Sequence, residues 1–234
     1  MSTLGFMMFD PMYWVYVGPA ILLALFAQMW VKSAFARAKE IGIRSGLSGA
    51  ETAQRILNAY GIDDVRIEPV RGFLGDHYSP NEKALRLSPD VYNGRSAAAV
   101  GVAAHEVGHA IQHAKGYAPL VLRNAIVPIA SLGSNLAFFL VIGGMFLHMM
   151  GLSVAGLILF GAVVVFQLVN LPVEFNASSR ARKILVTEGI VTQEEDREVG
   201  KVLNAAAMTY VAATVTAILQ MLYFASIVFG GSRD

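Results

Sequence analysis

The chain contains no cysteine among its 234 residues, and it has few charged side chains. Without thiols there can be no disulfide, no cysteine nucleophile and no cysteine metal ligand, so histidine, aspartate or glutamate must hold any metal. Charged residues make up 15% of the chain, against about 25% in an ordinary soluble domain, and hydrophobic residues make up 55%. With a mean hydropathy of +0.53, this composition predicts a membrane protein.

A strong charge of either sign is also absent. The 18 basic and 17 acidic side chains leave a formal net charge of +1. No stretch interleaves basic with aromatic residues in the way that nucleic-acid binding requires. We therefore expect no nucleic-acid partner, and we expect the lipid bilayer to be the main surroundings of the chain.

Four windows are apolar over about 20 residues, the length that a helix needs to cross roughly 30 Å of hydrocarbon. They are residues 12–31, 125–149, 152–171 and 205–229. Only a Met-Gly pair separates the second window from the third, which predicts a transmembrane hairpin with a minimal turn. Small residues in the windows, such as Gly144 and Gly161, allow helices to pack closely. We expect this packing within one chain first, with a homo-oligomer as the alternative.

Positive side chains gather at one end of each window. Those that flank the windows on this side are Lys32, Arg37, Lys39, Arg44, Lys115, Arg123, Arg180, Arg182, Lys183, Arg197 and Lys201. Lys and Arg beside membrane crossings stay in the cytoplasm, so both polar segments should be cytoplasmic and both termini outside. Residues 1–11 carry no Lys or Arg, which favours a retained helix over a cleaved signal peptide. We predict a multi-pass protein of the inner or plasma membrane.

The polar segments carry signals of local structure. Ser48 and Glu51 form a capping box before a short amphipathic helix, and Gly61 can end it. Downstream, DVRIEPV (64–70) and KALRLS (83–88) alternate with a two-residue period around a segment rich in turn residues. This pattern predicts that the two stretches pair as a β-hairpin.

Two further helix starts can be recognised. Ser96 can cap a helix that begins at about Ala97 and carries HEVGH. Thr192 and Glu195 form a second capping box, from which a helix could continue into the fourth window.

The stretch HEVGH places two histidines four residues apart around a glutamate. On a helix, His105 and His109 lie on one face and can offer imidazole nitrogens to a single zinc ion. Glu106 can accept a proton from water beside that ion, and Gly108 permits close approach of another element. The alternative is a polar helix face that binds nothing. The apolar surroundings favour the metal site, because unpaired polar groups there would cost several kcal/mol.

A catalytic zinc needs a third protein ligand and an open position. His113 lies about 80° round the helix from His105, so we expect it to cap the helix or to support a ligand instead. His77 could contact substrate or a developing oxyanion, or be a plain turn residue. His148 should lie on the far side of the membrane.

Glu174 is the preferred third ligand. The hairpin of the second and third windows returns to the side it left, which can bring Glu174 back beside His105 and His109. A carboxylate this close to an apolar span needs a partner, and a metal supplies one. The alternative is an ion pair with Arg180 or Arg182 at the head-group boundary.

Four motifs in order closely resemble the YugP-like family of bacterial neutral zinc metallopeptidases, which are membrane proteins. They are GDHYSP (75–80), LRLSPDVY (85–92), SAAAVGVAAHEVGHAIQH (96–113) and LPVEFNASSRA (171–181). The resemblance implies a gluzincin-type site, with Glu106 as general base and, as zinc ligands, His105, His109 and Glu174.

The chain is also distantly similar to the M48 membrane peptidases related to HtpX and Ste24. Their third-ligand helix reads E-x-x-x-D, whereas Ser178 occupies the matching fourth position after Glu174 here. Asn176 or Ser178 would then orient a ligand histidine, because such supporting partners usually exist.

These patterns predict a mainly α, polytopic membrane protein with four transmembrane helices and a small α+β cytoplasmic zincin-like domain containing a β-hairpin. The predicted parts are an N-terminal transmembrane helix (1–31), a metallopeptidase domain (32–124), a transmembrane hairpin (125–171), a third-ligand helix (172–204) and a C-terminal transmembrane helix with a tail (205–234).

The leading hypothesis is a zinc endopeptidase that cuts a peptide or membrane-protein substrate at the cytoplasmic side or the membrane interface. An extended substrate could add a strand to the predicted hairpin. The weaker candidates for oxyanion contact are His77, Tyr78 and Arg180. Two alternatives are an intramembrane protease and a non-catalytic scaffold stabilised by zinc.

Overall fold

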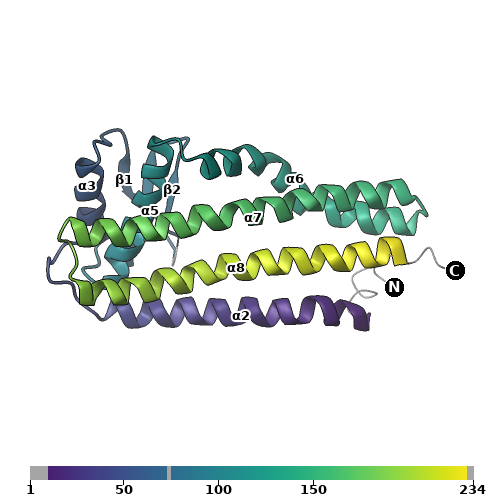
Figure 1. Cartoon of the computed structure of the whole chain (residues 1–234), viewed down its shortest axis with the longest axis horizontal. Coiled ribbons are helices and arrows are strands. Elements are labelled where there is room, and N and C mark those ends of the chain that lie inside the picture. The colour runs from purple at the N-terminus through teal and green to yellow at the C-terminus, as the bar shows by residue number, and fades with distance from the viewer. Residues whose placement is uncertain (1–9, 73–74, 231–234) are drawn as a thin grey trace. The chain divides into compact units, whose positions relative to one another are not determined.

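A computed structural model describes residues 10–72 and 75–230 of the chain (Figure 1). Long helices dominate this part, so the prediction of a mainly α fold is confirmed. The helices are α2 (Pro11–Lys39), α3 (Gly49–Ala59), α4 (Pro89–Tyr92), α5 (Ala97–Ala114), α6 (Ala118–Phe146), α7 (Met150–Thr187) and α8 (Gln193–Gly230). The strands are β1 (Arg66–Pro69), β2 (His77–Ser79) and β3 (Ala84–Leu87).

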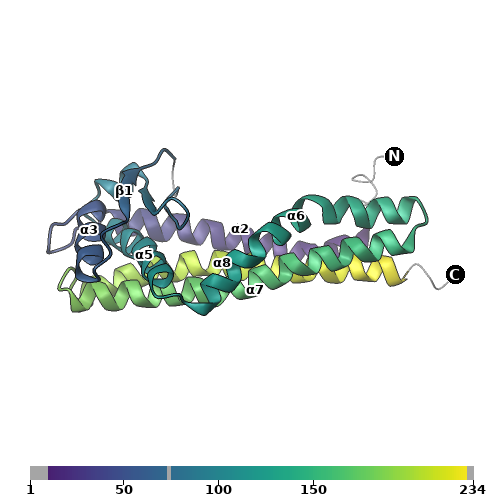
Figure 2. The same cartoon turned by 90° about the horizontal axis from the view of Figure 1, so that it is seen from above.

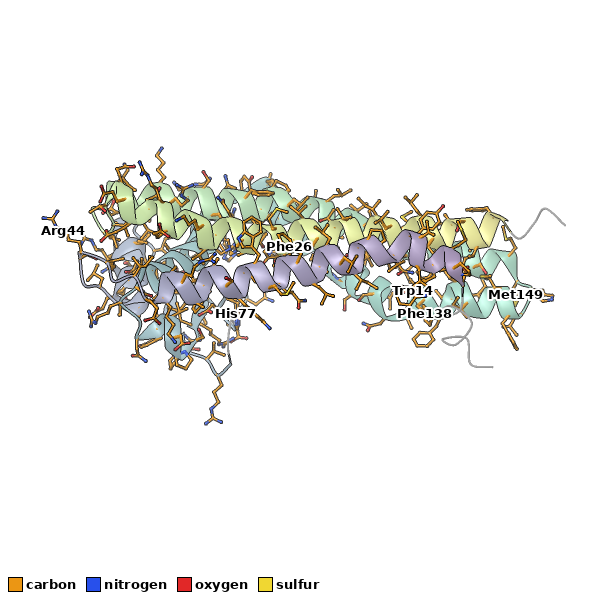
Figure 3. All side chains as sticks on the ribbon, turned by 90° about the horizontal axis from the view of Figure 1, so that it is seen from below. Trp14, Phe26, Arg44, His77, Phe138 and Met149 are labelled. Carbon is orange, nitrogen blue, oxygen red and sulfur yellow. The ribbon has the colours of Figure 1, made fainter. Side chains whose placement is uncertain are left out.

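Four helices in the described part are long and apolar enough to cross a membrane, which confirms the prediction of four transmembrane helices. They are α2, α6, α7 and α8. Large apolar side chains stand on their outer surface: Trp14 is 47% exposed and Phe26 is 56% exposed, and both project outward from α2 (Figure 3). Such exposure would be unfavourable in water but suits contact with lipid.

The chain divides into two compact units, each with its own core. Met1–Ala27, Leu122–Leu171 and Thr209–Asp234 form the first, here called the apolar unit. Gln28–Val121 and Pro172–Met208 form the second, the polar unit.

In the apolar unit, α6 runs into α7 through a short turn (Figure 2). Glycine lets the two helices approach closely: a Cβ at Gly144 would lie 2.4 Å from the backbone nitrogen of Ser153. The core of this unit consists of Val141, Leu157, Tyr223, Phe224 and Val228.

In the polar unit, all three expected helix starts are observed. Ser48 Oγ accepts from the Glu51 amide at 3.2 Å, and the Glu51 carboxylate accepts from the Ser48 amide at 2.7 Å. Thr192 and Glu195 repeat this reciprocal pair, and α8 continues from there into its apolar stretch. Ser96 Oγ accepts from the amide of residue 99 at 3.3 Å and caps α5. These bonds satisfy amides that a helix start leaves without partners.

The predicted strand pairing is wrong in one respect. Stretches 64–70 and 83–88 do contain neighbouring strands, β1 and β3, but these run parallel and are not a hairpin. The segment between them, expected as a turn, contains the short strand β2, which pairs antiparallel with β3 and gives the order β1-β3-β2. Parallel neighbours need a crossover connection, and here β2 lies between the two strands in the sequence. The hairpin in this fold is therefore β2–β3.

Candidate metal and active site

Helix α5 carries the HEVGH stretch and is buried along most of its length in the core of the polar unit. Gly108 lies where α5 meets α7. A Cβ at this position would lie 2.9 Å from the carbonyl oxygen and 3.2 Å from the Cα of Ala177. Only glycine allows the two backbones to come this close. The contact places the HEVGH part of α5 beside the part of α7 that carries Glu174.

Three side chains from these two helices converge. The rings of His105 and His109 are 4.8 Å apart between centroids and nearly perpendicular, at 87°. Their Nε2 atoms lie 3.3 and 3.6 Å from Glu174 Oε2. Glu174 is only 4% exposed, and Oε2 has no hydrogen-bond partner in the described part of the chain. A buried carboxylate oxygen that faces two imidazole nitrogens is stabilised by positive charge beside it, either a proton on an imidazole or a metal ion bound to all three groups.

The spacing of these atoms fits a zinc ion. Four ligand atoms placed tetrahedrally at about 2.0–2.1 Å from zinc are about 3.3–3.4 Å apart, close to the two distances observed. In residues 10–72 and 75–230, His105, His109 and Glu174 form a group whose ligand atoms all lie within 4.8 Å of one another. The donor set of two imidazoles and one carboxylate is the type that catalytic zinc uses.

The Nδ1 atom of each imidazole, on the side away from Glu174, also has a hydrogen-bond partner. His105 Nδ1 lies 3.1 Å from Ser178 Oγ, and His109 Nδ1 lies 3.0 Å from Gln112 Oε1. With both Nδ1 atoms engaged, the Nε2 atoms are the ones left for a metal. Ser178 was expected as such a partner, but Gln112 was not. Its signal in the sequence is a lone side-chain amide three residues after His109 on the same helix.

Neither arginine expected as an alternative partner contacts Glu174. Arg180 Nε donates to Asn176 Oδ1 at 2.6 Å, and Arg182 forms a two-point pair with Asp196 at 3.0 and 2.6 Å. Asn176 does not contact a ligand histidine itself. It accepts from Gln112 Nε2 at 3.0 Å and so reaches His109 through that residue.

Glu106 lies on α5 and is 8% exposed. Its Oε2 accepts from the backbone amide of Tyr78 at 2.9 Å, which ties strand β2 to the helix. The Tyr78 hydroxyl lies 2.9 Å from His113 Nδ1, a second tie between the same two elements. His113 is therefore not part of the converging group. His77, expected on a turn, lies in β2 with its ring exposed and Nδ1 2.9 Å from the carbonyl of Gly75.

The charges of the site change the acidity of its side chains. Burial disfavours the charged form of His109, but the nearby carboxylates of Glu174 and Glu106 outweigh burial and raise the pKa of His109. Burial, with a smaller contribution from the charge of Asp64, raises the pKa of the Tyr78 phenol. The Tyr78 hydroxyl is accordingly protonated at neutral pH and can act as a hydrogen-bond donor.

Comparison with known proteins identifies the protein family of this chain. A family model described as "Putative neutral zinc metallopeptidase" matches residues 13–229. The chain belongs to this family. The "Putative membrane protease YugP" of Bacillus subtilis (strain 168) is 50% identical over 215 residues, which cover 92% of this chain and 95% of that relative. No solved structure matches the chain. The resemblance drawn from the four motifs is thus confirmed, and it spans the helices as well as the site.

Proposed function

We propose that this member of the zinc metallopeptidase family is a membrane-integral endopeptidase that hydrolyses peptide bonds at the cytoplasmic side or the membrane interface. The observation that carries the proposal is the meeting of two histidines of α5 with a buried, unsatisfied carboxylate of α7. A second carboxylate, Glu106, comes from the turn of α5 that carries His105. The two histidines and Glu174 would hold a metal, and Glu106 would move a proton.

Zinc would be held by His105 Nε2, His109 Nε2 and Glu174 Oε2, where a bound ion acidifies water and polarises a carbonyl group. Glu106 is the proton carrier in this proposal. Its Oε2 is fixed by the Tyr78 amide, so Oε1 is free to take a proton from the attacking water and pass it to the leaving amine.

Strand β2 is the proposed docking edge for an extended substrate. It is an outer strand of the sheet, and the hydrogen bond from the Tyr78 amide to Glu106 sets its outer edge beside α5. A peptide that pairs with such an edge presents its backbone to the neighbouring helix. His77 and Tyr78, both on β2, are the proposed contacts for the developing oxyanion.

The distribution of Lys and Arg supports the cytoplasmic assignment, since these residues gather on one side of the four apolar windows. Arg95, Lys115 and Arg123 flank the HEVGH helix in sequence and favour an interfacial site over one buried within the hydrocarbon. The proposed substrates are therefore peptides or membrane-protein segments at the bilayer surface.

The substitution Glu106→Gln tests the proposal. A carboxamide oxygen can still accept from the Tyr78 amide, so the fold should survive, but it cannot carry the proton. We expect cleavage of casein or a quenched fluorescent peptide library to fall by about 10²–10⁴-fold, the usual contribution of a general acid–base group. Zinc content, measured by metal analysis of the purified protein, should stay at the wild-type value.

A matched control is Glu194→Gln, which removes an exposed carboxylate in the first turn of α8. It should cleave like wild type. Equal cleavage by Glu106→Gln would contradict the catalytic proposal. Stoichiometric zinc in a wild-type protein that cuts none of these substrates would instead support the scaffold alternative.

A further inference from the structure

A chain of side chains lies behind His109, on the side away from Glu174. Gln112 Oε1 is 3.0 Å from His109 Nδ1, and Gln112 Nε2 donates to Val173 O at 2.9 Å and to Asn176 Oδ1 at 3.0 Å. Arg180 Nε donates to the same Asn176 oxygen at 2.6 Å. Gln112 is fully buried, so no solvent competes for these bonds.

Each bond in this chain has one direction. The carbonyl oxygen of Val173 can only accept, so the Gln112 atom that faces it must be the NH₂ group. The guanidinium of Arg180 can only donate, so the Asn176 atom that faces it must be the oxygen. Both ends therefore require that Gln112 turn its carbonyl oxygen toward His109.

The orientation of Gln112 determines the tautomer of the His109 imidazole. Because Gln112 Oε1 can only accept, His109 Nδ1 must carry the hydrogen. In the neutral ring Nε2 then keeps its lone pair, and this is the atom that lies 3.6 Å from Glu174 Oε2. His105 differs, since its Nδ1 faces the Ser178 hydroxyl, which can donate or accept.

We propose that Gln112, Asn176 and Arg180 form a positioning relay that holds His109 as the Nδ1–H tautomer and thereby sets the metal affinity of the site. The proposal rests on the metal site of the proposed function. It also gives Arg180 a positioning role in place of the expected oxyanion contact. Its guanidinium carbon lies 5.9 Å from the Tyr117 ring centroid, which helps to keep the group behind the histidine.

Zinc competition with a chromogenic chelator, on the full chain in detergent, tests the relay. Gln112→Met keeps the length of the side chain but removes every polar contact. We expect it to weaken Zn²⁺ binding by about 10–100-fold, the usual effect of losing a ligand's supporting partner. Asn176→Leu should weaken binding in the same direction, whereas Asn176→Asp keeps an acceptor for Gln112 and Arg180 and should stay within about threefold of wild type.

Two controls separate positioning from general damage. Arg197→Met removes an exposed cation of α8 and should bind Zn²⁺ like wild type. The absorption spectrum of the Co²⁺-loaded protein should change in Gln112→Met but not in Asn176→Asp, because it reports ligand geometry.

Wild-type affinity in both Gln112→Met and Asn176→Leu would overturn the relay while leaving the metal site intact. Absence of Zn²⁺ binding in the wild type would instead contradict the proposed function. In that case, or if Gln112→Met fails to fold, the ¹⁵N histidine spectrum of metal-free wild type, recorded at a pH where the His109 ring is neutral, decides the relay. In the neutral ring, a hydrogen on Nδ1 supports it, and a hydrogen on Nε2 overturns it.

Discussion

At the scale of the residue, the site is a set of buried polar groups whose burial is favourable only because they interact with one another. Glu174 Oε2 is buried without a hydrogen bond, and two imidazole nitrogens face it. A buried carboxylate in this state costs several kcal/mol unless a cation joins the group. The chemistry of the donors therefore accounts for polar side chains in an otherwise apolar core.

The two ligand histidines should depend on their partners to different degrees. Ser178 contacts His105 but its hydroxyl does not impose a tautomer, whereas Gln112 does so for His109. We predict that Ser178→Ala weakens Zn²⁺ binding by at most about tenfold, the lower end of the usual range. Chelator competition beside Gln112→Met measures the difference. A larger loss in Ser178→Ala than in Gln112→Met would contradict this ranking.

Sequence patterns predicted that His105, His109 and Glu174 lie together, and they predicted Ser178 but not Gln112 as a partner of a histidine. His105, Glu106 and His109 follow from helical spacing, and Glu174 from the return of a hairpin to its starting side. The two partners of the Gln112 NH₂ group lie 61 and 64 residues away, and the amide that holds Glu106 lies 28 residues away. Such pairs depend on the register of two packed elements, which a local sequence pattern does not specify.

At the scale of the element, α5 and α7 meet through a glycine. Replacing a helical glycine with alanine normally stabilises a helix by about 1 kcal/mol. At Gly108 the new Cβ would lie 2.9 Å from the Ala177 carbonyl oxygen, and overpacking of this kind costs about 1–3 kcal/mol. We predict that Gly108→Ala lowers the thermal unfolding temperature of the purified protein and weakens Zn²⁺ binding.

Gly143→Ala is the matched control for this prediction, since Gly143 is also helical and, beyond the backbone of its own helix, no atom lies within 4 Å of its added Cβ. It should unfold at the wild-type temperature or above it. Equal or greater stability of Gly108→Ala would show that α5 and α7 are not packed as described.

Local signals predicted the elements better than their pairing. The capping boxes at Ser48 and Thr192 were confirmed because each involves residues three apart in sequence. The sheet was mispredicted because β2 has only three residues and lies among Gly, Pro and Asn, which are typical of turns. With β2 paired antiparallel to β3, the strands β1 and β3 lie side by side in the parallel direction.

At the scale of the whole molecule, the orientation in the membrane decides which compartment supplies the substrate. The positive side chains predict that residues 32–124 face the cytoplasm and the α6–α7 turn faces outside. The chain has no cysteine, so single-cysteine variants give an unambiguous reading. Ser45 and Met149 are suitable positions because both are exposed.

In intact cells, a membrane-impermeant maleimide should label Met149→Cys but not Ser45→Cys. Both variants should react after the membrane is opened with detergent. Labelling of Ser45→Cys in intact cells would reverse the orientation and place the proposed active site outside. Self-association of the chain stays a prediction, which the mass of the detergent-solubilised protein would test.

The central claim is that α5 and α7 together hold one metal ion. Metal analysis of purified wild type beside His109→Ala and Glu174→Ala tests it most directly. We predict about one zinc per wild-type chain and loss of stoichiometric zinc in both variants, because a catalytic site has only three protein ligands. Full zinc occupancy in Glu174→Ala would contradict the account, since the carboxylate of α7 would then not belong to the site.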